Sequence, residues 1–411
     1  MRQLTGEFKE TEIGPIPSDW AYIPFGQVAT LQRGKDLPTR SRTEGDYPII
    51  GSNGIVGFHN DYVVDGYCLT VGRSGSVGKL FLHNGRSWPL NTALWVKDFH
   101  ENIPEFVYYL LQTFDFVKYS TGVSVPTLNR NYVHDVPLPL PPLDEQRRIA
   151  AVLAAIQDAI AAQEDVIAAA RAFKRSLMHR LFTYGPGRVP AETKETEIGE
   201  IPSHWDVVTV DDVLNVKLGK MLSQKAKQGI SPRPYMRNAN VQWGYVDLNN
   251  VAEMDFSPNE QERFRLEKDD ILVCEGGEVG RTAIWNNQLE ECYYQKAIHR
   301  LRPKSKSTIS PYYFLHYMTL IFLVRNVSVV EGARSTIAHI PVAKLKALPL
   351  ALPHKSEQDQ IVGAIGSIDA KIAAEEDRKA ALDALFKSML HQLMTGQIRL
   401  LEDEELLAQG L

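Results

Sequence analysis

Long apolar runs and cysteines are scarce in this sequence. No stretch of 18 or more apolar residues occurs, which argues against a membrane-spanning helix. The first ten residues are polar and charged, so no secretory leader is expected. The three cysteines, Cys68, Cys274 and Cys292, form no Cys-x-x-Cys pair, which disfavours a disulfide framework or a zinc site. We therefore expect a cytoplasmic protein without a structural metal.

Catalytic motifs are missing as well. The segment Gly72–Lys79 comes nearest to a phosphate-binding loop, but Arg73 and Leu80 stand where that loop needs glycine and serine or threonine. Ser74 lacks the Gly-x-Ser-x-Gly frame of a hydrolase nucleophile. No Asn/Asp-Pro-Pro-Tyr/Phe segment of the amino-methyltransferase kind occurs. Metal-ligand spacing is absent among four histidines, His59, His83, His100 and His134. We expect no catalytic residue and no cofactor in this chain.

The distribution of charge is more informative than its sum. The chain carries 45 Lys and Arg against 50 Asp and Glu, a formal net charge of −5. Most of the acidic excess lies in residues 356–411, which hold 5 basic and 11 acidic residues, whereas residues 194–355 hold 21 and 19. Binding to nucleic acid needs only a local basic surface, so the total does not exclude it. The acidic last segment is expected to face protein and not nucleic acid.

The sequence contains a long internal repeat. Residues 9–20 return as residues 194–205 with ten of twelve positions identical, at an offset of 185. Weaker matches follow in the same order at offsets that grow to 212: Gly75–Lys79 with Gly277–Arg281, Leu138–Leu140 with Leu348–Leu350, Glu145–Ile149 with Glu357–Ile361, and Ser176–Thr183 with Ser388–Thr395. Conserved order with growing offsets indicates a duplicated unit with insertions in its second copy, and therefore two similar domains.

Each copy begins with a globular part of mixed character. Short β-type runs such as Tyr67–Val71 and Ile271–Cys274 alternate with turns rich in Gly, Asn and Asp. A helix is predicted near residues 104–119, and its counterpart near residues 311–324. These patterns predict a globular part built from both strands and helices in each copy.

A long helix is predicted at the end of each copy. The first runs from a cap at Asp144 to about Thr183, and the second from about Ser356 to Thr395. Forty residues at 1.5 Å each make a rod of roughly 60 Å. Apolar or small residues recur at spacings of three and four: Ile149, Val152, Ile156, Ala159, Val166, Ala170, Phe173 and Leu177 in the first helix, and Ile361, Ile365, Ile368, Ile372, Leu382, Leu385, Met389 and Leu393 in the second.

Two packing arrangements are open for these helices. Each could pack on its own globular part, or the two could bury their stripes against each other as a coiled coil. The spacing persists beyond what a domain helix of about 20 residues needs, so the paired coiled coil is the preferred prediction.

Taken together, these features resemble the specificity (S) subunits of Type I restriction-modification systems over nearly the whole chain. The resemblance is carried by Glu-Ile-Gly-x-Ile-Pro-x-x-Trp at the start of both halves, by Gly51–Gly57, by Pro137–Gln146, and by the Ser-Leu-Met-x-x-Leu-Phe-Thr type of helix ending. It implies an α+β fold in which two similar target recognition domains of mixed α/β character are separated by a long antiparallel two-helix coiled coil. Each domain would read half of a split DNA site.

The resemblance also implies a non-catalytic chain with partners. Modification subunits would methylate adenine with S-adenosylmethionine, and restriction subunits would translocate and cut double-stranded DNA with ATP and Mg. The expected division is a first recognition domain at residues 1–143, a central helix at 144–185, a second recognition domain at 186–355, a C-terminal helix at 356–396 and an acidic tail at 397–411. The second copy departs from the family pattern in having Leu352–Ser356 where the first has Pro141–Asp144.

Two glycine-rich loops are candidate phosphate contacts. The first contains Arg73, Ser74 and Lys79, and the second ends in Arg281. Glycine lets the backbone approach a phosphate, and free N–H groups in such loops bind anions. The alternative is a tight hairpin turn that carries a solvated cation.

A polar segment before the proline run is the candidate base reader. Asn129, Arg130 and Asn131 lie there, and Arg334 lies in the corresponding stretch of the second copy. Arginine bridges guanine O6 and N7, and asparagine bridges adenine N6 and N7. The alternative is a polar turn without a ligand.

Basic clusters near the start of each copy complete the candidate contacts. They include Arg33 and Lys35, with Arg40 and Arg42, in the first copy, and Lys217 and Lys220, with Lys225 and Lys227, in the second, where Arg237 and Asn238 follow. Each of these residues is equally consistent with a solvated surface. Trp20 and Trp205 are predicted to be core anchors and not base stackers.

Two other functions compete with the specificity subunit. A stand-alone transcription factor needs a helix-turn-helix or a similar groove reader, and none is evident. A methyltransferase or nuclease fused to recognition domains needs cofactor motifs that this sequence lacks. Sequence-specific DNA binding within a multisubunit complex is therefore the preferred interpretation.

Overall fold

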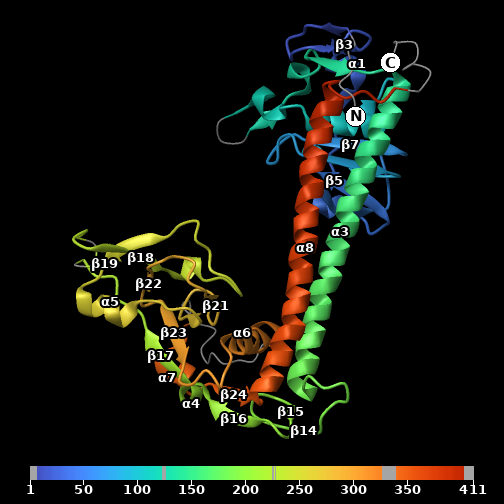
Figure 1. The fold of residues 1–411 in the computed structure, drawn as a ribbon. Coiled ribbons are helices and arrows are strands. Elements are labelled where there is room, and N and C mark those ends of the chain that lie inside the picture. Colours follow the sequence, from blue (N-terminus) through green and yellow to red (C-terminus); the bar gives the residue numbers. More distant parts are fainter. Residues whose placement is uncertain (1–6, 123–125, 225, 227, 326–338, 402–411) are drawn as a thin grey trace. The chain divides into compact units, whose positions relative to one another are not determined.

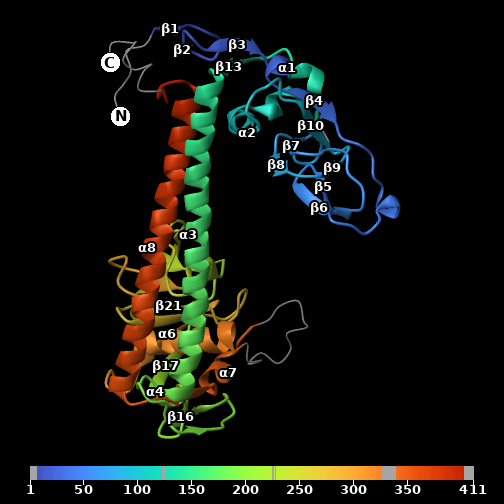
Figure 2. The same ribbon diagram turned by 90° about the vertical axis from the view of Figure 1, so that its right-hand side faces the viewer.

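A computed structural model describes residues 7–122, 126–224, 226, 228–325 and 339–401, and Figures 1 and 2 trace the chain from blue to red. Its contacts form two compact units. Unit 1 comprises residues 1–165 and 377–411, and unit 2 comprises residues 166–376. The division passes through both long helices, so each helix contributes one part to each unit.

Unit 1 is built from short strands, and in the described part of the chain two of its sheets have more than two strands. One is a four-stranded antiparallel sheet of order β4–β10–β7–β8, and the other has three strands in the order β6–β5–β9. The elements before the first long helix are β1 (Phe8–Lys9), β2 (Ile16–Pro17), β3 (Ala21–Pro24), α1 (Phe25–Val28), β4 (Thr30–Arg33), η1 (Thr39–Ser41), β5 (Tyr47–Gly51), β6 (Gly54–His59), β7 (Tyr67–Gly72), β8 (Leu80–Asn84), β9 (Trp88–Pro89), β10 (Ala93–Asp98), α2 (Pro104–Gln112), η2 (Phe116–Tyr119), β11 (Ser120–Thr121), β12 (Thr127–Leu128), η3 (Arg130–Tyr132) and β13 (Pro137–Leu140).

The core of unit 1 lies between the four-stranded sheet, α2 and the long helices. α2 starts with Pro104 at its first position, which suits proline because that N–H has no helical partner. Its buried face packs with Ile149 and Leu393 of the long helices in one apolar cluster. Trp20, 1% exposed, belongs to the same cluster, so its predicted role as a core anchor is confirmed. The helix predicted near residues 104–119 is α2 followed by the short η2.

Unit 2 repeats this arrangement. Its four-stranded sheet has the order β17–β23–β20–β21, the counterpart of β4–β10–β7–β8, and β19–β18–β22 form a three-stranded sheet. Figure 1 shows α6 beside β21 of the four-stranded sheet, which it contacts. The elements are β14 (Thr193–Lys194), β15 (Ile201–Pro202), β16 (Asp206–Thr209), α4 (Val210–Val213), β17 (Leu214–Leu218), β18 (Pro232–Met236), η5 (Asn238–Asn240), β19 (Ala252–Asp255), α5 (Pro258–Phe264), β20 (Asp270–Cys274), β21 (Thr282–Trp285), β22 (Tyr293–Tyr294), β23 (Ile298–Pro303), α6 (Pro311–Thr319), the π-helical turn η6 (Leu320–Val324), α7 (Val342–Lys346) and β24 (Pro349–Leu352).

Aromatic side chains join α6 to the long helices within unit 2. The Phe182 ring stacks on Tyr313 at 5.4 Å and meets Trp205 edge-on at 6.4 Å. Trp205 is fully buried in this cluster, as predicted for a core anchor. The helix predicted near residues 311–324 corresponds to α6 and η6.

The Glu-Gln pair that occurs in both copies fastens each helix start to its own globular part. The buried Gln146 side chain accepts a hydrogen bond from the Ile103 N–H at 3.1 Å and donates one to the Pro141 carbonyl at 3.0 Å. Gln358 does the same in unit 2, accepting from the Ser310 N–H at 2.8 Å and donating to the Pro353 carbonyl at 3.0 Å. The amide satisfies backbone groups that would otherwise be buried without partners.

The two long helices are α3 (Leu143–Tyr184) and α8 (Lys355–Met394). α3 begins one residue before Asp144, which was predicted to cap it but lies in its first turn. Within unit 1, Glu164 of α3 pairs with Lys379 of α8 at 3.1 Å. Within unit 2, Arg171 pairs with Glu376 at 2.6 Å. In each unit the helices therefore pack on each other and on the globular part, so the two alternatives do not exclude one another.

The predicted apolar stripe is wrong at several positions of these helices. Val166 and Phe173 of α3 are 41% and 56% exposed, and Leu385 of α8 is 46% exposed. Gln163 and Ile167 of α3 are buried instead. The residues of α3 that face inward alternate in steps of four and three positions, and Gln163 is one of them. The prediction left out Gln163 because it is polar and continued at Val166, one residue before the buried Ile167.

Among the described residues, no helix is both long and apolar enough to cross a membrane.

Candidate nucleic-acid interface

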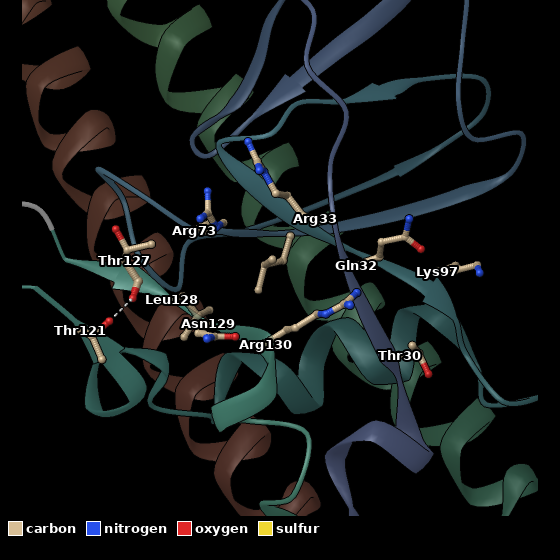
Figure 3. Close-up of a pocket in the computed structure, with 11 residues that line it drawn as sticks. Thr30, Gln32, Arg33, Arg73, Lys97, Thr121, Thr127, Leu128, Asn129 and Arg130 are labelled. Atoms are coloured by element: carbon tan, nitrogen blue, oxygen red, sulfur yellow. Dashed lines mark hydrogen bonds between the residues drawn. The ribbon is translucent and has the colours of Figure 1, made fainter.

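A cavity of about 770 Å³ on unit 1 gathers most of the basic residues predicted for the first copy. It is lined by Thr30, Gln32, Arg33, Arg73, Leu94, Lys97, Thr121, Thr127, Leu128, Asn129 and Arg130. We call it the basic cavity. Four of these residues are Lys or Arg, and none of them is acidic, so the cavity presents positive charge to an anionic ligand. Figure 3 shows these side chains on strands of the sheet and on the segment that ends in Arg130.

A backbone hydrogen bond brings distant parts of the sequence together at this cavity. The Leu128 N–H donates to the Arg73 carbonyl at 2.8 Å, and β12 thereby lies along the first glycine-rich loop. The Arg73 guanidinium donates to the Asn91 carbonyl at 3.3 Å, which holds the side chain at the rim. Two candidates predicted from separate motifs, Arg73 and Asn129, therefore line the same surface.

Arg130 is held against strand β4 while its side chain stays exposed. Its Nη1 donates to the Leu31 carbonyl at 3.3 Å, and the Leu31 N–H donates to Nε2 of His134 at 3.0 Å. Burial, and then the charge of Arg130, lower the pKa of His134, so that the imidazole is neutral and accepts this hydrogen bond. The Asn129 side chain accepts from the Asn131 N–H at 3.1 Å and so begins the turn that presents Arg130.

Lys97 completes the basic cavity, and no motif in the sequence singled it out. It lies on β10, next to a bulge between Val96 and Asp98. A lone lysine at the end of a strand has no motif, and its place beside Gln32 follows only from the pairing of β10 with β4. Arg33 is half exposed and 3.5 Å from Asp36, an ion pair at the surface that is worth little.

The other candidates of the first copy lie outside the basic cavity. Lys35, Lys79 and Asn131 are exposed, and Ser74 bridges to Thr127 through the backbone. The glycine-rich loop forms a hairpin turn between β7 and β8, in which the Gly72 N–H donates to the Lys79 carbonyl at 2.8 Å. Amide groups that close the turn are not available to bind an anion, so Lys79 remains a predicted contact through its side chain alone.

The candidates of unit 2 are mostly engaged within the protein. Lys220 pairs with Glu260 at 2.6 Å, and its side chain is only 11% exposed. Arg281 donates to the Asn238 carbonyl at 2.6 Å, and the Asn238 amide donates to the Gly276 carbonyl at 2.7 Å. Arg237 donates to the Asn250 carbonyl at 2.7 Å. Arg334 lies outside the described residues, and Lys217 lies on β17 opposite Arg300.

Two residues of the basic cavity, Arg33 and Arg73, have no basic counterpart at the equivalent positions of unit 2. Leu218 holds the place that Arg33 has in unit 1. Each of the two residues precedes a glycine, Gly219 or Gly34, whose N–H donates a hydrogen bond to the neighbouring strand. The Ile340 N–H donates to the Glu275 carbonyl at 2.8 Å, as the Leu128 N–H does to that of Arg73. The second unit therefore has Glu275 in place of Arg73, which reverses the charge there.

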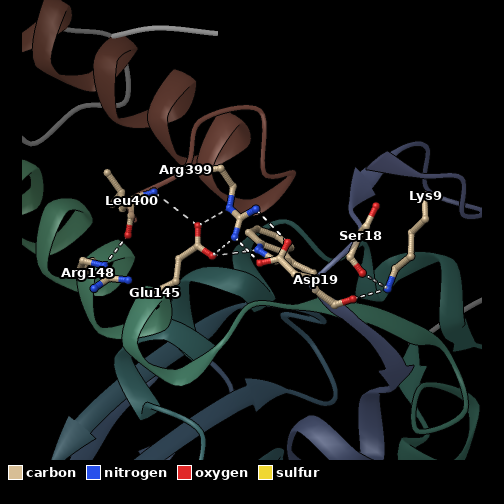
Figure 4. A network of polar contacts seen from close by, with 8 residues as sticks. Lys9, Ser18, Asp19, Glu145, Arg148, Arg399 and Leu400 are labelled. Carbon is tan, nitrogen blue, oxygen red and sulfur yellow. Dashed lines mark hydrogen bonds and ion pairs between the residues drawn. The ribbon is translucent and has the colours of Figure 1, made fainter. Parts of the chain in front are cut away.

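A buried ionic network in unit 1 fastens the segment that follows α8 (Figure 4). Arg399, 8% exposed, donates to Glu145 at 2.8 Å and to Asp19 at 2.7 Å. Trp20 Nε1 donates to the same Glu145 carboxylate at 2.9 Å. Arg148 donates to the Leu400 carbonyl. Residues 397–401 of the predicted acidic tail thus bind their own chain, while residues 402–411 lie outside the described residues.

Among the described residues, no group of three or more His, Cys, Asp or Glu side chains could hold a metal ion. The three cysteines are buried, and burial raises the pKa of the Cys68 thiol to about 11. A protonated buried thiol is a poor nucleophile. The basic cavity itself offers positive charge and hydrogen-bond donors to a ligand.

A family model and several known proteins match this chain. The family model for the type I restriction modification DNA specificity domain matches residues 17–169 and again residues 202–384. The chain belongs to this family. The MjaVIII specificity subunit of Methanocaldococcus jannaschii, a type I restriction enzyme subunit, is 25% identical over 95% of this chain and 96% of its own length. The EcoBI specificity subunit of Escherichia coli is 25% identical over 68% of this chain and 62% of its own length.

Two solved structures share the fold. The S subunit of a type I restriction-modification system from M. genitalium is 16% identical and has a TM-score of 0.56, over 95% of this chain and 99% of that one. A chain from a study of complex assembly and conformational transition of the type I R-M system is 17% identical and has a TM-score of 0.60, over 93% of this chain and 99% of that one. The mixed α/β fold with long helices is thus that of type I specificity subunits.

Proposed function

We propose that this chain is the non-catalytic DNA-recognition subunit of a type I restriction-modification complex, and that each unit reads one half of a bipartite target. The basic cavity carries the proposal. Its Arg33, Arg73, Lys97 and Arg130 face one space that no acidic side chain lines, on the domain that the family model matches. Phosphate contacts supply most of the affinity for DNA, and base contacts supply the specificity.

Within the cavity, Arg130 and Asn129 are the proposed base readers. Both are exposed, and the short turn η3 presents them. The Arg130 guanidinium uses one Nη1–H for Leu31, so its other donors are available for guanine O6 and N7. Arg33, Arg73 and Lys97 surround this reader with positive charge and suit the flanking phosphates.

The long helices are proposed to form an antiparallel coiled coil that spaces the two half-sites. Inward positions of α8 at 358, 361, 365, 368, 372, 375, 379, 382, 386, 389 and 393 follow alternating steps of three and four. This is the repeat of a coiled-coil seam. Readers of adjacent major grooves lie about 34–36 Å apart, so we expect about five to eight unspecified base pairs between the half-sites.

Catalysis is assigned to partner subunits in the cytoplasm. Modification subunits would methylate adenine with S-adenosylmethionine, and restriction subunits would use ATP and Mg. Val166 and Phe173 are exposed apolar residues seven positions apart on α3, so they lie on one face of that helix. An exposed apolar stripe on a helix is suited to packing against another helix, and we assign this one to the modification subunits.

Exchange of a whole domain tests the function. Residues 21–136 are replaced by the corresponding segment of another specificity subunit, and the methylated sequences are mapped for the complex with its modification subunits. Only one half-site should change, because the basic cavity belongs wholly to unit 1. Changes in both halves, or in neither, would contradict the proposal. Exchange of the mostly helical segment 144–184 is the control, and it should leave both half-site sequences unaltered.

A further inference from the structure

Beside Lys217 on β17, which was already a candidate contact, strand β23 and helix α5 of unit 2 carry cations that no sequence motif marked. Lys217 lies directly opposite Arg300, and Asn215 lies opposite Arg302, in the antiparallel register of these strands. Arg263, near the end of α5, acts electrostatically on Lys217 together with Arg300. We call Lys217, Arg263, Arg300 and Arg302 the cationic cluster.

Arg300 is the unusual member of the cationic cluster. The residue is 8% exposed, and its buried Nε has no hydrogen-bond partner within the part of the chain that the structure describes. Among the residues that the structure describes, no carboxylate lies within ion-pair distance of it. A buried charge is costly when it lacks a counter-ion, and proteins rarely leave one unpaired. An anion from outside the chain would supply the missing partner.

The neighbours of Arg300 do not neutralise it. Asp270, 1% exposed, is taken by Arg302, which donates to both of its oxygens at 2.7 and 2.8 Å. Glu267 also pairs with Arg302, at 2.8 Å. The buried Tyr294 hydroxyl has no hydrogen-bond partner among the described residues, and burial raises its pKa to about 12, so it stays neutral.

Arg302 is ion-paired, but the two other cations next to Arg300, Lys217 and Arg263, have no ion pair among the residues that the structure describes. Burial lowers the pKa of the Lys217 ammonium, and the charges of Arg300 and Arg263 lower it further, which shows that the positive charges repel one another. Arg263 is exposed, and its guanidinium lies 5.1 Å from the centre of the Phe264 ring. Within the described residues neither side chain has an ion pair. Bound negative charge would relieve this repulsion.

The cluster occupies the strand pair that lines the basic cavity in unit 1. β17 and β23 hold the places of β4 and β10 in the sheet order, and Lys217 opposite Arg300 corresponds to Gln32 opposite Trp95. The glycine-rich loop of unit 2 does not offer the same charge, because Arg281 is 13% exposed and engaged with Asn238.

We propose that Lys217, Arg263 and Arg300 bind a backbone phosphate of the half-site read by unit 2. The inference rests on the proposed function and adds that unit 2 contacts DNA through different positions of the same strand pair. Arg263 and Lys217 reach the phosphate oxygens from the surface, and Arg300 supplies an unscreened positive charge beneath them. Arg302 stays paired with Asp270 and Glu267 and does not contact the phosphate.

Salt dependence of DNA binding tests the proposal. The full chain, assembled with its modification subunits, is titrated onto a labelled duplex that carries its target at 50–200 mM salt. The double variant Lys217→Gln/Arg263→Gln should lower the slope of log K against log salt by about one, because the loss of one neutralised phosphate removes about 0.9. Affinity should fall by the same factor for the target and for a duplex with a scrambled second half-site. Both residues have exposed surface, so the fold should persist.

Lys306→Gln is the matched control, because Lys306 is an exposed lysine of the same unit on a turn outside the cluster. It should leave the slope unchanged. A double variant with the wild-type slope, or one that alters only the preferred bases, would overturn the phosphate assignment. The proposed function fails differently: the wild-type complex would then show no preference for the target over a fully scrambled duplex.

Discussion

Removal of the Arg399 side chain should destabilise unit 1 by about 3 kcal/mol. The change Arg399→Ala leaves the Glu145 carboxylate, 1% exposed, without its cation. Loss of one partner from a buried pair costs about 3–5 kcal/mol, and the lower end applies because Trp20 still donates to Glu145 at 2.9 Å. At about 2–4 °C per kcal/mol for a unit of this size, the melting temperature should fall by about 6–12 °C.

The chain supplies a matched control for Arg399. Arg188 stands three residues after Gly185, as Arg399 stands three residues after Gly396, and both glycines have positive φ, 76° and 70°. Arg188 is exposed, so Arg188→Ala should cost less than about 0.5 kcal/mol. Calorimetry measures the two transitions, and hydrogen exchange shows whether the loss lies in unit 1. Equal effects of the two substitutions would refute the argument from burial.

Restoring neutrality gives a second check. In the double variant Glu145→Gln/Arg399→Ala no unpaired carboxylate remains, so part of the lost stability should return. Asp19→Asn should cost less than Arg399→Ala, because the Asp19 side chain is half exposed. A double variant less stable than Arg399→Ala alone would show that the cost arises from lost packing and not from the uncompensated charge.

Three further outcomes are expected. Arg130→Ala should weaken DNA binding by about 1–3 kcal/mol and relax the preference at one base position in competition assays. Arg130→Lys should keep the positive charge but lose the two parallel hydrogen bonds that a guanidinium makes to guanine. Unchanged binding would contradict base reading. Burial lowers the pKa of His316 to about 4, so below pH 6.5 the unfolded state takes up a proton that the folded state does not. Stability of unit 2 in denaturant should therefore fall as pH drops from about 6.5 to about 4, and His316→Phe should flatten this decline while a change at the exposed His391 should not. One heptad inserted in each long helix, after Asp165 and after Glu376, should move the units apart by about 10 Å and lengthen the preferred spacer by about one to three base pairs; an unchanged spacer optimum would show that the helices do not set it.

The duplicated sequence was enough to predict two similar units and two long helices, because repeat order and a sustained three-four spacing are local properties of the chain. The basic cavity was only partly predictable. Arg73 and Arg130 were each singled out by motif, but their meeting depends on the hydrogen bond from Leu128 to the Arg73 carbonyl. Strand pairing of this kind is a tertiary property that single segments do not reveal.

The charged residues of unit 2 also show what could not be predicted from the sequence alone. Arg281 matches Lys79 in sequence, yet it is mostly covered because the segment around Asn238, which has no counterpart in the motif, packs over it. Arg300 was passed over because a lone arginine in a strand carries no signal. Only the three-dimensional structure shows that its buried Nε has no hydrogen-bond partner among the described residues.

The construction of unit 1 from both ends of the chain has a consequence for synthesis. Glu145 and Arg399 are 254 residues apart in sequence, and at about 5–20 residues per second the ribosome takes about 13–50 s to pass from one to the other. All of unit 2, residues 166–376, emerges in that interval and is able to fold on completion. The N-terminal strands are made first, yet their unit is finished last. During this wait its apolar surface around Trp20 and Ile149 lacks Met389 and Leu393, and a nascent chain stalled before α8 would expose it to chaperones and proteases.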